Sequence, residues 1–197
     1  MKDAFLKIFE QINSPFKLFV LVIMFVLSVA GWFFYTEKDT FMASYKAQQA
    51  LPRMNGKYED ATAFILKRTE ADLVAIFEVN TLLNTRKVAW IQTREDGRVR
   101  AHDGYNVGLF SNNLANNRDV IGLMSGDAPC SEYKAAQSYI GFFYLDKGIT
   151  YMCRISVPPE QTFIGQITVG WRVKPSDDEV SRTVMRVASN ILYSTPR

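Results

Sequence analysis

Residues Leu18–Tyr35 read LFVLVIMFVLSVAGWFFY, a stretch of about eighteen residues without a charge. A helix of this length reaches about 27 Å at 1.5 Å per residue, close to the roughly 30 Å hydrocarbon core of a bilayer. A helix of a soluble domain is rarely apolar on every face, because one side usually meets water or a polar neighbour. We therefore predict one transmembrane helix, whose marker residues are Leu18, Met24, Ser28, Gly31, Trp32 and Tyr35.

Charged residues on either side of this stretch predict its orientation. Three lysines precede it, at Lys2, Lys7 and Lys17, whereas the segment after it, residues 37–39, reads Glu-Lys-Asp and is net acidic. Lysine and arginine hold their side of a span in the cytoplasm. We therefore expect a single-pass protein with a cytoplasmic N-terminus and an exported C-terminal domain.

A cleaved signal peptide is the alternative to a permanent anchor. Ser28 and Ala30 fit the small-x-small pattern that a signal peptidase reads. The apolar run is longer than the usual 7 to 15 residues, however, and it continues through four aromatic residues, 32–35, beyond that site. Aromatic rings are enriched at the interface between lipid and water. These features favour an uncleaved span.

The span divides the chain into four parts. Residues 1–17 form a short tail, either an amphipathic helix on the cytoplasmic leaflet or a plain lead-in to the span, which is 18–35. Residues 36–55 are predicted as a stalk helix and residues 56–197 as one exported domain. The chain is 48% hydrophobic and 13% aromatic, enough for a core in that domain. Because the net charge is only +3 and Lys and Arg are scattered, we expect no nucleic-acid partner.

The exported part mixes helical and strand patterns. Helical spacing predicts a helix at about 57–67, a short helix at about 117–124 and a final helix, whereas runs of β-branched and aromatic residues predict strands at 73–79, 88–93, 139–145, 149–157 and 163–173. This order predicts an α+β fold, in which an antiparallel sheet of about five strands is packed by helices. The layout resembles PAS-like and GAF-like modules in topology only and implies no ligand.

Two patterns near the C-terminus predict which faces are buried. The last strand alternates apolar residues with Gln166, Thr168 and Arg172, which predicts one buried face and one wetter face. The final helix is predicted to start at a capping box formed by Ser176 and Glu179. Its apolar residues fall on one stripe, predicted to be its buried face. That stripe contains Val180, Val184, Val187 and Ile191.

The sequence offers little for catalysis or metal binding. The single histidine, His102, lies in a turn-rich stretch and has no second histidine at metal-ligand spacing. No GxSxG, phosphate-binding or metalloprotease motif occurs in the chain, and the carboxylates fall at turns and at a helix start. We therefore expect no enzyme activity, no cofactor and no metal site.

The two cysteines both lie on the side of the span that we expect to be exported, where thiols are oxidised. Cys153 shares the apolar face of its predicted strand with Tyr151, Ile155 and Val157. Cys130 begins the loop that leads into the predicted strand 139–145. The sequence leaves two alternatives, a Cys130–Cys153 disulfide or two buried free cysteines. We favour the disulfide.

Several segments together resemble the single-span holins of T-even phages, the class III holins. They are the aromatic stalk TFMASYKAQQ, EADLVAIFEVN at 70–80, TYMCRISV around Cys153, GQITVGWRV at 165–173 and the closing SNIL. The resemblance implies accumulation in the host inner membrane with the C-terminal domain in the periplasm, homo-oligomerisation into large lesions that release endolysin, and timing by an antiholin bound to the periplasmic domain. Residues 106–130 depart from the family, so the resemblance assigns no antiholin-binding residue.

Two other classes of function remain open. One is a membrane-anchored periplasmic module that binds a ligand or assists assembly, and the other is an anchored periplasmic enzyme, for which no motif speaks. Neighbouring genes for an endolysin and spanins would favour the holin over both.

Overall fold

The computed structural model describes residues 15–50, 53–159 and 162–194. It divides into a unit that ends at Leu51 and a compact unit that begins at Pro52. Within the first unit, α2 (Pro15–Ala50) is one continuous helix of 36 residues, so the predicted span and stalk form a single element. Proline is well placed at its first position, where the backbone N–H would have no helical partner. Residues 1–14 of the predicted tail lie outside the described residues.

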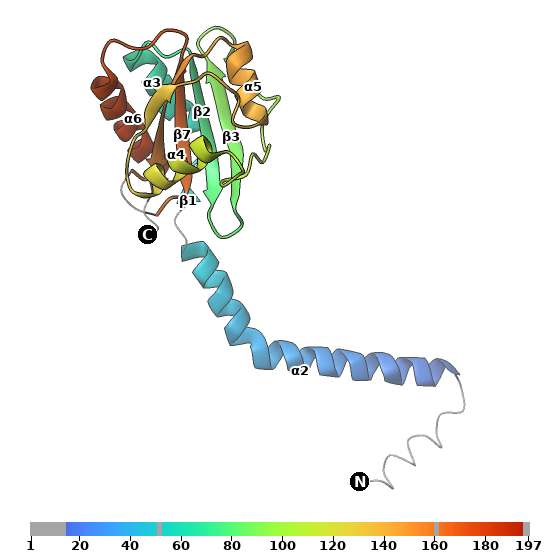
Figure 1. Cartoon of the computed structure of the whole chain (residues 1–197). Helices are drawn as coiled ribbons and strands as arrows, with labels where there is room; N and C mark the ends of the chain where they lie inside the picture. Colours follow the sequence, from blue (N-terminus) through green and yellow to red (C-terminus); the bar gives the residue numbers. More distant parts are fainter. Residues whose placement is uncertain (1–14, 51–52, 160–161, 195–197) are drawn as a thin grey trace. The chain divides into compact units, whose positions relative to one another are not determined.

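The second unit is built on a six-stranded antiparallel sheet with the order β4-β3-β2-β7-β6-β5 (Figure 1). Its strands are β2 (Leu73–Asn80), β3 (Thr85–Thr93), β4 (Gly97–Arg98), β5 (Cys130–Glu132), β6 (Tyr151–Val157) and β7 (Gly165–Trp171). The central pair β2–β7 runs in register from Leu73 opposite Gly170 to Glu78 opposite Gly165. The α+β prediction is therefore correct, and the sheet has one strand more than the five expected.

Helices α3 (Tyr58–Arg68) and α6 (Asp178–Leu192) cover one face of this sheet (Figure 1). Alternate residues of the strands point toward them, among them Val74, Ile76 and Ile167, and pack into one core cluster with Ile65 of α3 and Met185 of α6. The sequence predicted α3 within one residue at each end, and Ala61, Thr62 and Ile65 form its buried face.

The opposite face carries α4 (Leu114–Met124) and α5 (Tyr139–Asp146) (Figure 1). Leu73 and Phe77 of β2 point to this side and form a second cluster with Ile140 and Tyr144 of α5. Val120 of α4 belongs to a third, smaller cluster. The sheet is therefore buried on both faces.

Two predictions about this second face are wrong. Residues 139–145 form α5 and not a strand, because the apolar side of this short segment lies on top of the sheet. The face of β7 that was expected to be wetter is buried as well, with Gln166 and Thr168 exposed by only 1% and 2%. Covering elements exclude water there, and Gln166 donates to the Thr168 hydroxyl at 2.7 Å.

The start and the buried face of α6 also differ from their predictions. Asp177 caps the helix, since its side chain accepts hydrogen bonds from the backbone N–H of Glu179 and Val180, in place of the predicted Ser176 capping box. Half of the predicted stripe is exposed, at Val180 and Val187, whereas Val184 and Ile191 are partly buried against the core cluster. The buried face contains small residues, which let the helix approach the sheet closely. It consists of Ser181, Met185, Ala188, Ser189 and Leu192.

A second, two-stranded sheet joins the two ends of this unit. β1 (Arg53–Met54) pairs antiparallel with β8 (Tyr193–Ser194), with Met54 opposite Tyr193. Asn55 extends the junction, because its side-chain amide donates to the carbonyl of Ile191. The domain therefore includes residues 53–55, which the sequence placed in the stalk.

Candidate functional site

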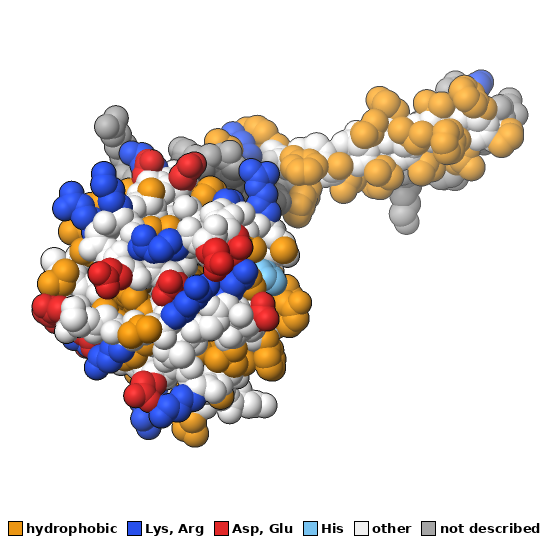
Figure 2. Space-filling model, turned by 90° about the horizontal axis from the view of Figure 1, so that it is seen from above, with side chains coloured by type: hydrophobic (Ala, Val, Ile, Leu, Met, Phe, Trp, Pro, Cys, Tyr) orange, Lys and Arg blue, Asp and Glu red, His pale blue; other side chains and the backbone are white. Residues whose placement is uncertain are grey.

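The segment predicted to cross the membrane is present as a helix that meets that requirement. Residues Pro15–Thr40 of α2 are long and apolar enough to span a bilayer, and none of the described window is buried in the protein. Met24, Trp32 and Tyr35 are each more than 60% exposed, and Leu18 is 44% exposed. Figure 2 shows apolar side chains along this helix. The surface that these side chains form is suited to lipid.

Two hydroxyl groups of this helix are satisfied within it. The Ser28 hydroxyl donates to the carbonyl of Met24 at 2.7 Å, and the Thr36 hydroxyl donates to the carbonyl of Trp32 at 3.1 Å. A Cβ atom added at Gly31 would meet no atom within 4 Å. Ser28 and Gly31 lie three residues apart, so the two small residues share one side of the helix.

Cys130 and Cys153 are joined in a disulfide, as we favoured from the sequence. The bond links β5 to β6, where the two residues are direct cross-strand partners. Cys153 is fully buried in the cluster that also contains Tyr151, Ile155 and Val157. The disulfide therefore ties the short edge strand β5 to the core of the domain.

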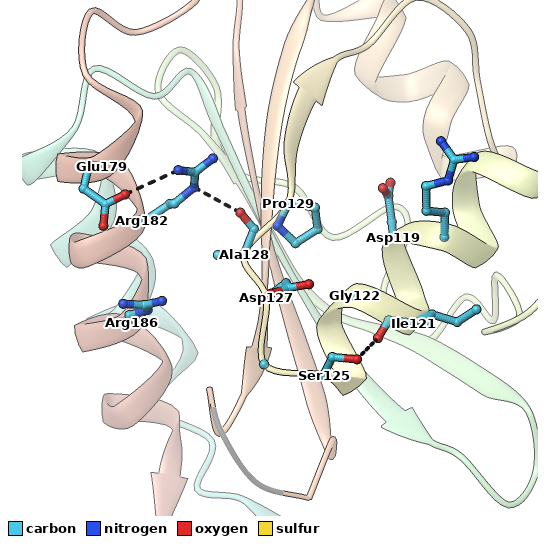
Figure 3. Close-up of a pocket in the computed structure, with 12 residues that line it drawn as sticks. Asp119, Ile121, Gly122, Ser125, Asp127, Ala128, Pro129, Glu179, Arg182 and Arg186 are labelled. Atoms are coloured by element: carbon cyan, nitrogen blue, oxygen red, sulfur yellow. Dashed lines mark hydrogen bonds and ion pairs between the residues drawn. The ribbon is translucent and has the colours of Figure 1, made fainter.

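A groove lies between α4 and α6 on the surface of the domain (Figure 3). Its volume is about 670 Å³, and its floor is the loop that leads from α4 to β5. Arg182 of α6 reaches into it, where Nε donates to the carbonyl of Ala128 and Nη1 pairs with Glu179 at 3.3 Å. Arg118 of α4 and Arg186 of α6 add two exposed guanidinium groups. Carboxylates also line this surface, at Asp119, Asp127 and Glu179.

A polar network lies under α4 and α5, against the buried face of β7. Arg86 of β3 is 7% exposed and donates from Nη1 to Gln166 and from Nη2 to Asn116, both at 2.9 Å. Arg154 of β6 is 5% exposed and is paired with Asp119 of α4. Burial, the largest cause, and the nearby Arg154 lower the pKa of Arg86 to about 10, so its guanidinium remains charged at neutral pH.

Two tyrosines complete this network from the side of α5. The Tyr133 hydroxyl accepts a hydrogen bond from the backbone N–H of Gln137 at 3.2 Å. The hydroxyl of Tyr144 is buried and has no hydrogen-bond partner among the described residues. Burial raises the pKa of Tyr144, which keeps its hydroxyl protonated and able to donate.

The sequence missed both arginines, although each left a signal. Arg86 falls two residues before the buried Val88 and thus has the inward parity of β3, and Arg154 interrupts the apolar run YMCRISV. A charge at an inward strand position requires a partner, because an unpaired buried charge is costly. Asp119, which lies in the segment 106–130, supplies that partner for Arg154.

His102 lies where the sequence placed it, in a turn, and its ring contacts that of Phe143 of α5 in a tilted arrangement with centroids 4.8 Å apart. Among the described residues, no group of three or more His, Cys, Asp or Glu side chains is placed to hold a metal ion. The arrangement around His102 is therefore an aromatic contact that anchors the turn to α5.

Comparison with known proteins identifies a fold. No protein-family model matches the chain, and no curated protein matches it in sequence. The GAF domain of a two-component sensor histidine kinase from Bacillus halodurans matches with a TM-score of 0.50 and 10% identity, over 68% of this chain and 90% of that chain. A far-red cyanobacteriochrome photoreceptor matches with a TM-score of 0.49 and 7% identity, over 81% and 95%. The domain after the apolar helix thus has a GAF-like α+β fold.

Proposed function

We propose that the chain is a holin of the single-span class, which accumulates in a host inner membrane and assembles into lesions that release endolysin. The observation that carries this proposal is the 18–35 segment of α2, which is apolar on all sides and has no buried part in the described chain. Such a helix is stable in lipid or against copies of itself, because both surroundings satisfy an apolar surface. The disulfide-bonded domain supplies a folded body outside the membrane.

The hydrogen bonds within the helix favour assembly into large lesions rather than into a narrow channel. A channel built from one helix face would require polar or charged groups that face water. Here the Ser28 and Thr36 hydroxyls donate to carbonyls of their own helix, and residues 18–35 carry no charge. Association would then rest on close packing at the small residues Ser28 and Gly31 and on contacts between the domains.

We further propose a cytoplasmic N-terminus and a periplasmic domain, with an antiholin bound to that domain and with no enzymatic activity. The Cys130–Cys153 disulfide supports this orientation, because such bonds persist in the periplasm and are rare in the cytosol. An alkaline phosphatase fusion after Arg197 should be active, and one before Phe16 should be inactive. The reverse pattern would place the domain in the cytoplasm.

The function itself is tested by lysis in a bacterium. The full-length protein is induced together with a cytoplasmic endolysin that lacks an export signal. Abrupt lysis that requires both proteins is the expected result. Continued growth, with both proteins well expressed and the chain in the membrane fraction, would contradict the holin.

Substitutions at one position provide the matched control. Met24→Asp places a charge near the middle of the span, where it costs about 2.5–3.5 kcal/mol, and should impair insertion or assembly and delay lysis. Met24→Leu keeps an apolar side chain of similar size and should lyse like the unaltered protein. If both variants lyse the cell at the same time, the span does not take part in lysis.

A membrane-anchored module that binds a ligand or assists assembly is the second candidate. The groove between α4 and α6 favours it, because about 670 Å³ is within the size range of ligand sites. Arg182→Ala with Arg186→Ala would alter that groove while leaving α2 unchanged. If the protein is a binding module, the double variant should no longer retain a partner in a pull-down from the periplasm. The unaltered protein should then cause no lysis when it is co-expressed with endolysin.

A further inference from the structure

The starting point is an unequal number of buried charges around Arg86. Arg86 and Arg154 are both more than 90% buried, and Asp119 is the carboxylate that pairs with Arg154. The partners of Arg86 are the neutral amides of Gln166 and Asn116. A buried charge without a counter-charge is unfavourable by several kcal/mol. The network as described therefore carries one positive charge too many.

A small cavity, partly open to the surface, lies beside these groups. Its volume is about 20 Å³, and it is lined by Arg86, Arg154, Tyr133, Tyr144 and Gln137, with Ser138 at the N-terminus of α5. None of the residues that line it is Asp or Glu. Guanidinium, hydroxyl and amide groups thus make up most of the lining, and the apolar side chains of Phe77 and Val107 complete it.

Two of the groups that line this cavity have donors without a partner. The Nε of Arg86 and the hydroxyl of Tyr144 are buried and make no hydrogen bond to the described residues. A buried donor left unpaired costs about 1–3 kcal/mol, and more when it is charged. Both donors and the excess charge would be satisfied by one acceptor that is negative.

We propose that this cavity binds a monatomic anion of the size of chloride, held by Arg86, Arg154 and the Tyr144 hydroxyl. A space of about 20 Å³ holds one such ion or one to two water molecules, and it is too small for phosphate, sulfate or an organic acid. The anion neutralises Arg86 and links β3, β6 and α5. Because Asn116 and Asp119 hold the same arginines, it also secures α4 to the sheet.

The test is the stability of the full-length protein in detergent micelles, in sodium chloride and in sodium gluconate at equal ionic strength. A ligand at about ten times its Kd raises the Tm of a domain of this size by about 3–6 °C. We expect a rise of this order in chloride and in bromide, and a broadening of the chlorine NMR signal that bromide reverses. Equal Tm values in chloride and gluconate, with no broadening, would overturn the proposal and leave water in the cavity.

Variants separate the site from a general effect of salt. Tyr144→Phe removes a hydroxyl without a protein partner, so the fold is retained, and it should weaken chloride binding about tenfold or more. Arg86→Met should abolish the chloride response where it folds. Arg186→Met removes an exposed arginine of the α4–α6 groove and should leave the response intact. An undiminished response in Tyr144→Phe would refute the assigned site.

Discussion

Cys130 of β5 lies directly opposite Cys153 of β6, with their Cα atoms 4.0 Å apart and their sulfur atoms bonded. The bond closes a loop with a sequence separation of 23 residues. On the chain-entropy model, closing a loop of this length stabilises a domain by about 3 kcal/mol. We expect the paired Cys130→Ser and Cys153→Ser variant to lose about that much free energy of unfolding, measured by denaturant titration. Equal stability in the two proteins would contradict this prediction.

The Asp177 side chain is predicted to stabilise α6 through its cap. Oδ1 accepts from the backbone N–H of Glu179 at 2.8 Å and of Val180 at 3.2 Å. Asp177→Ala removes both bonds and should lower the free energy of unfolding by about 1 kcal/mol. Ser176→Ala is the matched control, since the neighbouring serine is exposed, and it should change stability by less than about 0.5 kcal/mol. A larger loss of unfolding free energy in Ser176→Ala than in Asp177→Ala would show that Ser176 caps the helix, as the capping box predicted.

The Asp96–Lys147 ion pair predicts a pH dependence. The ammonium of Lys147 lies 2.7 Å from Asp96 Oδ2, and this contact, followed by the Thr93 hydroxyl, lowers the pKa of Asp96. A lowered folded-state pKa means that the stabilisation is present above the ordinary carboxyl pKa and is lost as the pH falls through the folded value. The Tm should therefore fall more steeply between about pH 5 and about pH 2 in the unaltered protein than in Asp96→Asn. Parallel curves would show that the pair contributes nothing, and added salt should reduce any difference.

Gly31 is predicted to set how closely copies of α2 approach. A Cβ atom added at this position meets nothing within 4 Å beyond the adjoining backbone of its own helix, so Gly31→Leu should insert normally. It should nevertheless weaken self-association, because small residues let helices pack closely in lipid. The measurement is an in-membrane association assay alongside lysis timing, with Gly31→Ala as the intermediate case. Unchanged association in Gly31→Leu would locate the packing face elsewhere.

The elements that were predicted correctly are those with a long or regular pattern. The apolar segment of α2 is long enough to indicate a helix without any tertiary information, and α3 shows a plain helical spacing of Ala61 and Ile65. The central strands β2 and β6 also follow their apolar runs. Local pattern and tertiary environment agree in these elements.

The wrong predictions arise where the tertiary environment decides. The segment YIGFFYLD has the aromatic content of a strand, yet it forms α5 because Ile140 and Tyr144, four residues apart, both pack on the sheet. The polar residues of β7 indicated a solvent-exposed face. No local pattern shows that the Arg86 guanidinium hydrogen-bonds to Gln166 on that face. That contact joins residues 80 positions apart. Long-range pairs of this kind cannot be read from a single sequence.

The pairing of β1 with β8 determines how mechanical tension passes through the domain. The chain enters the domain at Arg53 and leaves its described part at Ser194, and these two residues face each other across a ladder of two pairs. A pull between the anchor and the C-terminal end therefore loads that ladder and the Asn55 contacts first, ahead of the six-stranded sheet. The ladder would peel apart one pair at a time, beginning at Arg53, and relieve the strain. The first part of the domain to open under such a pull is thus this short ladder and not the core.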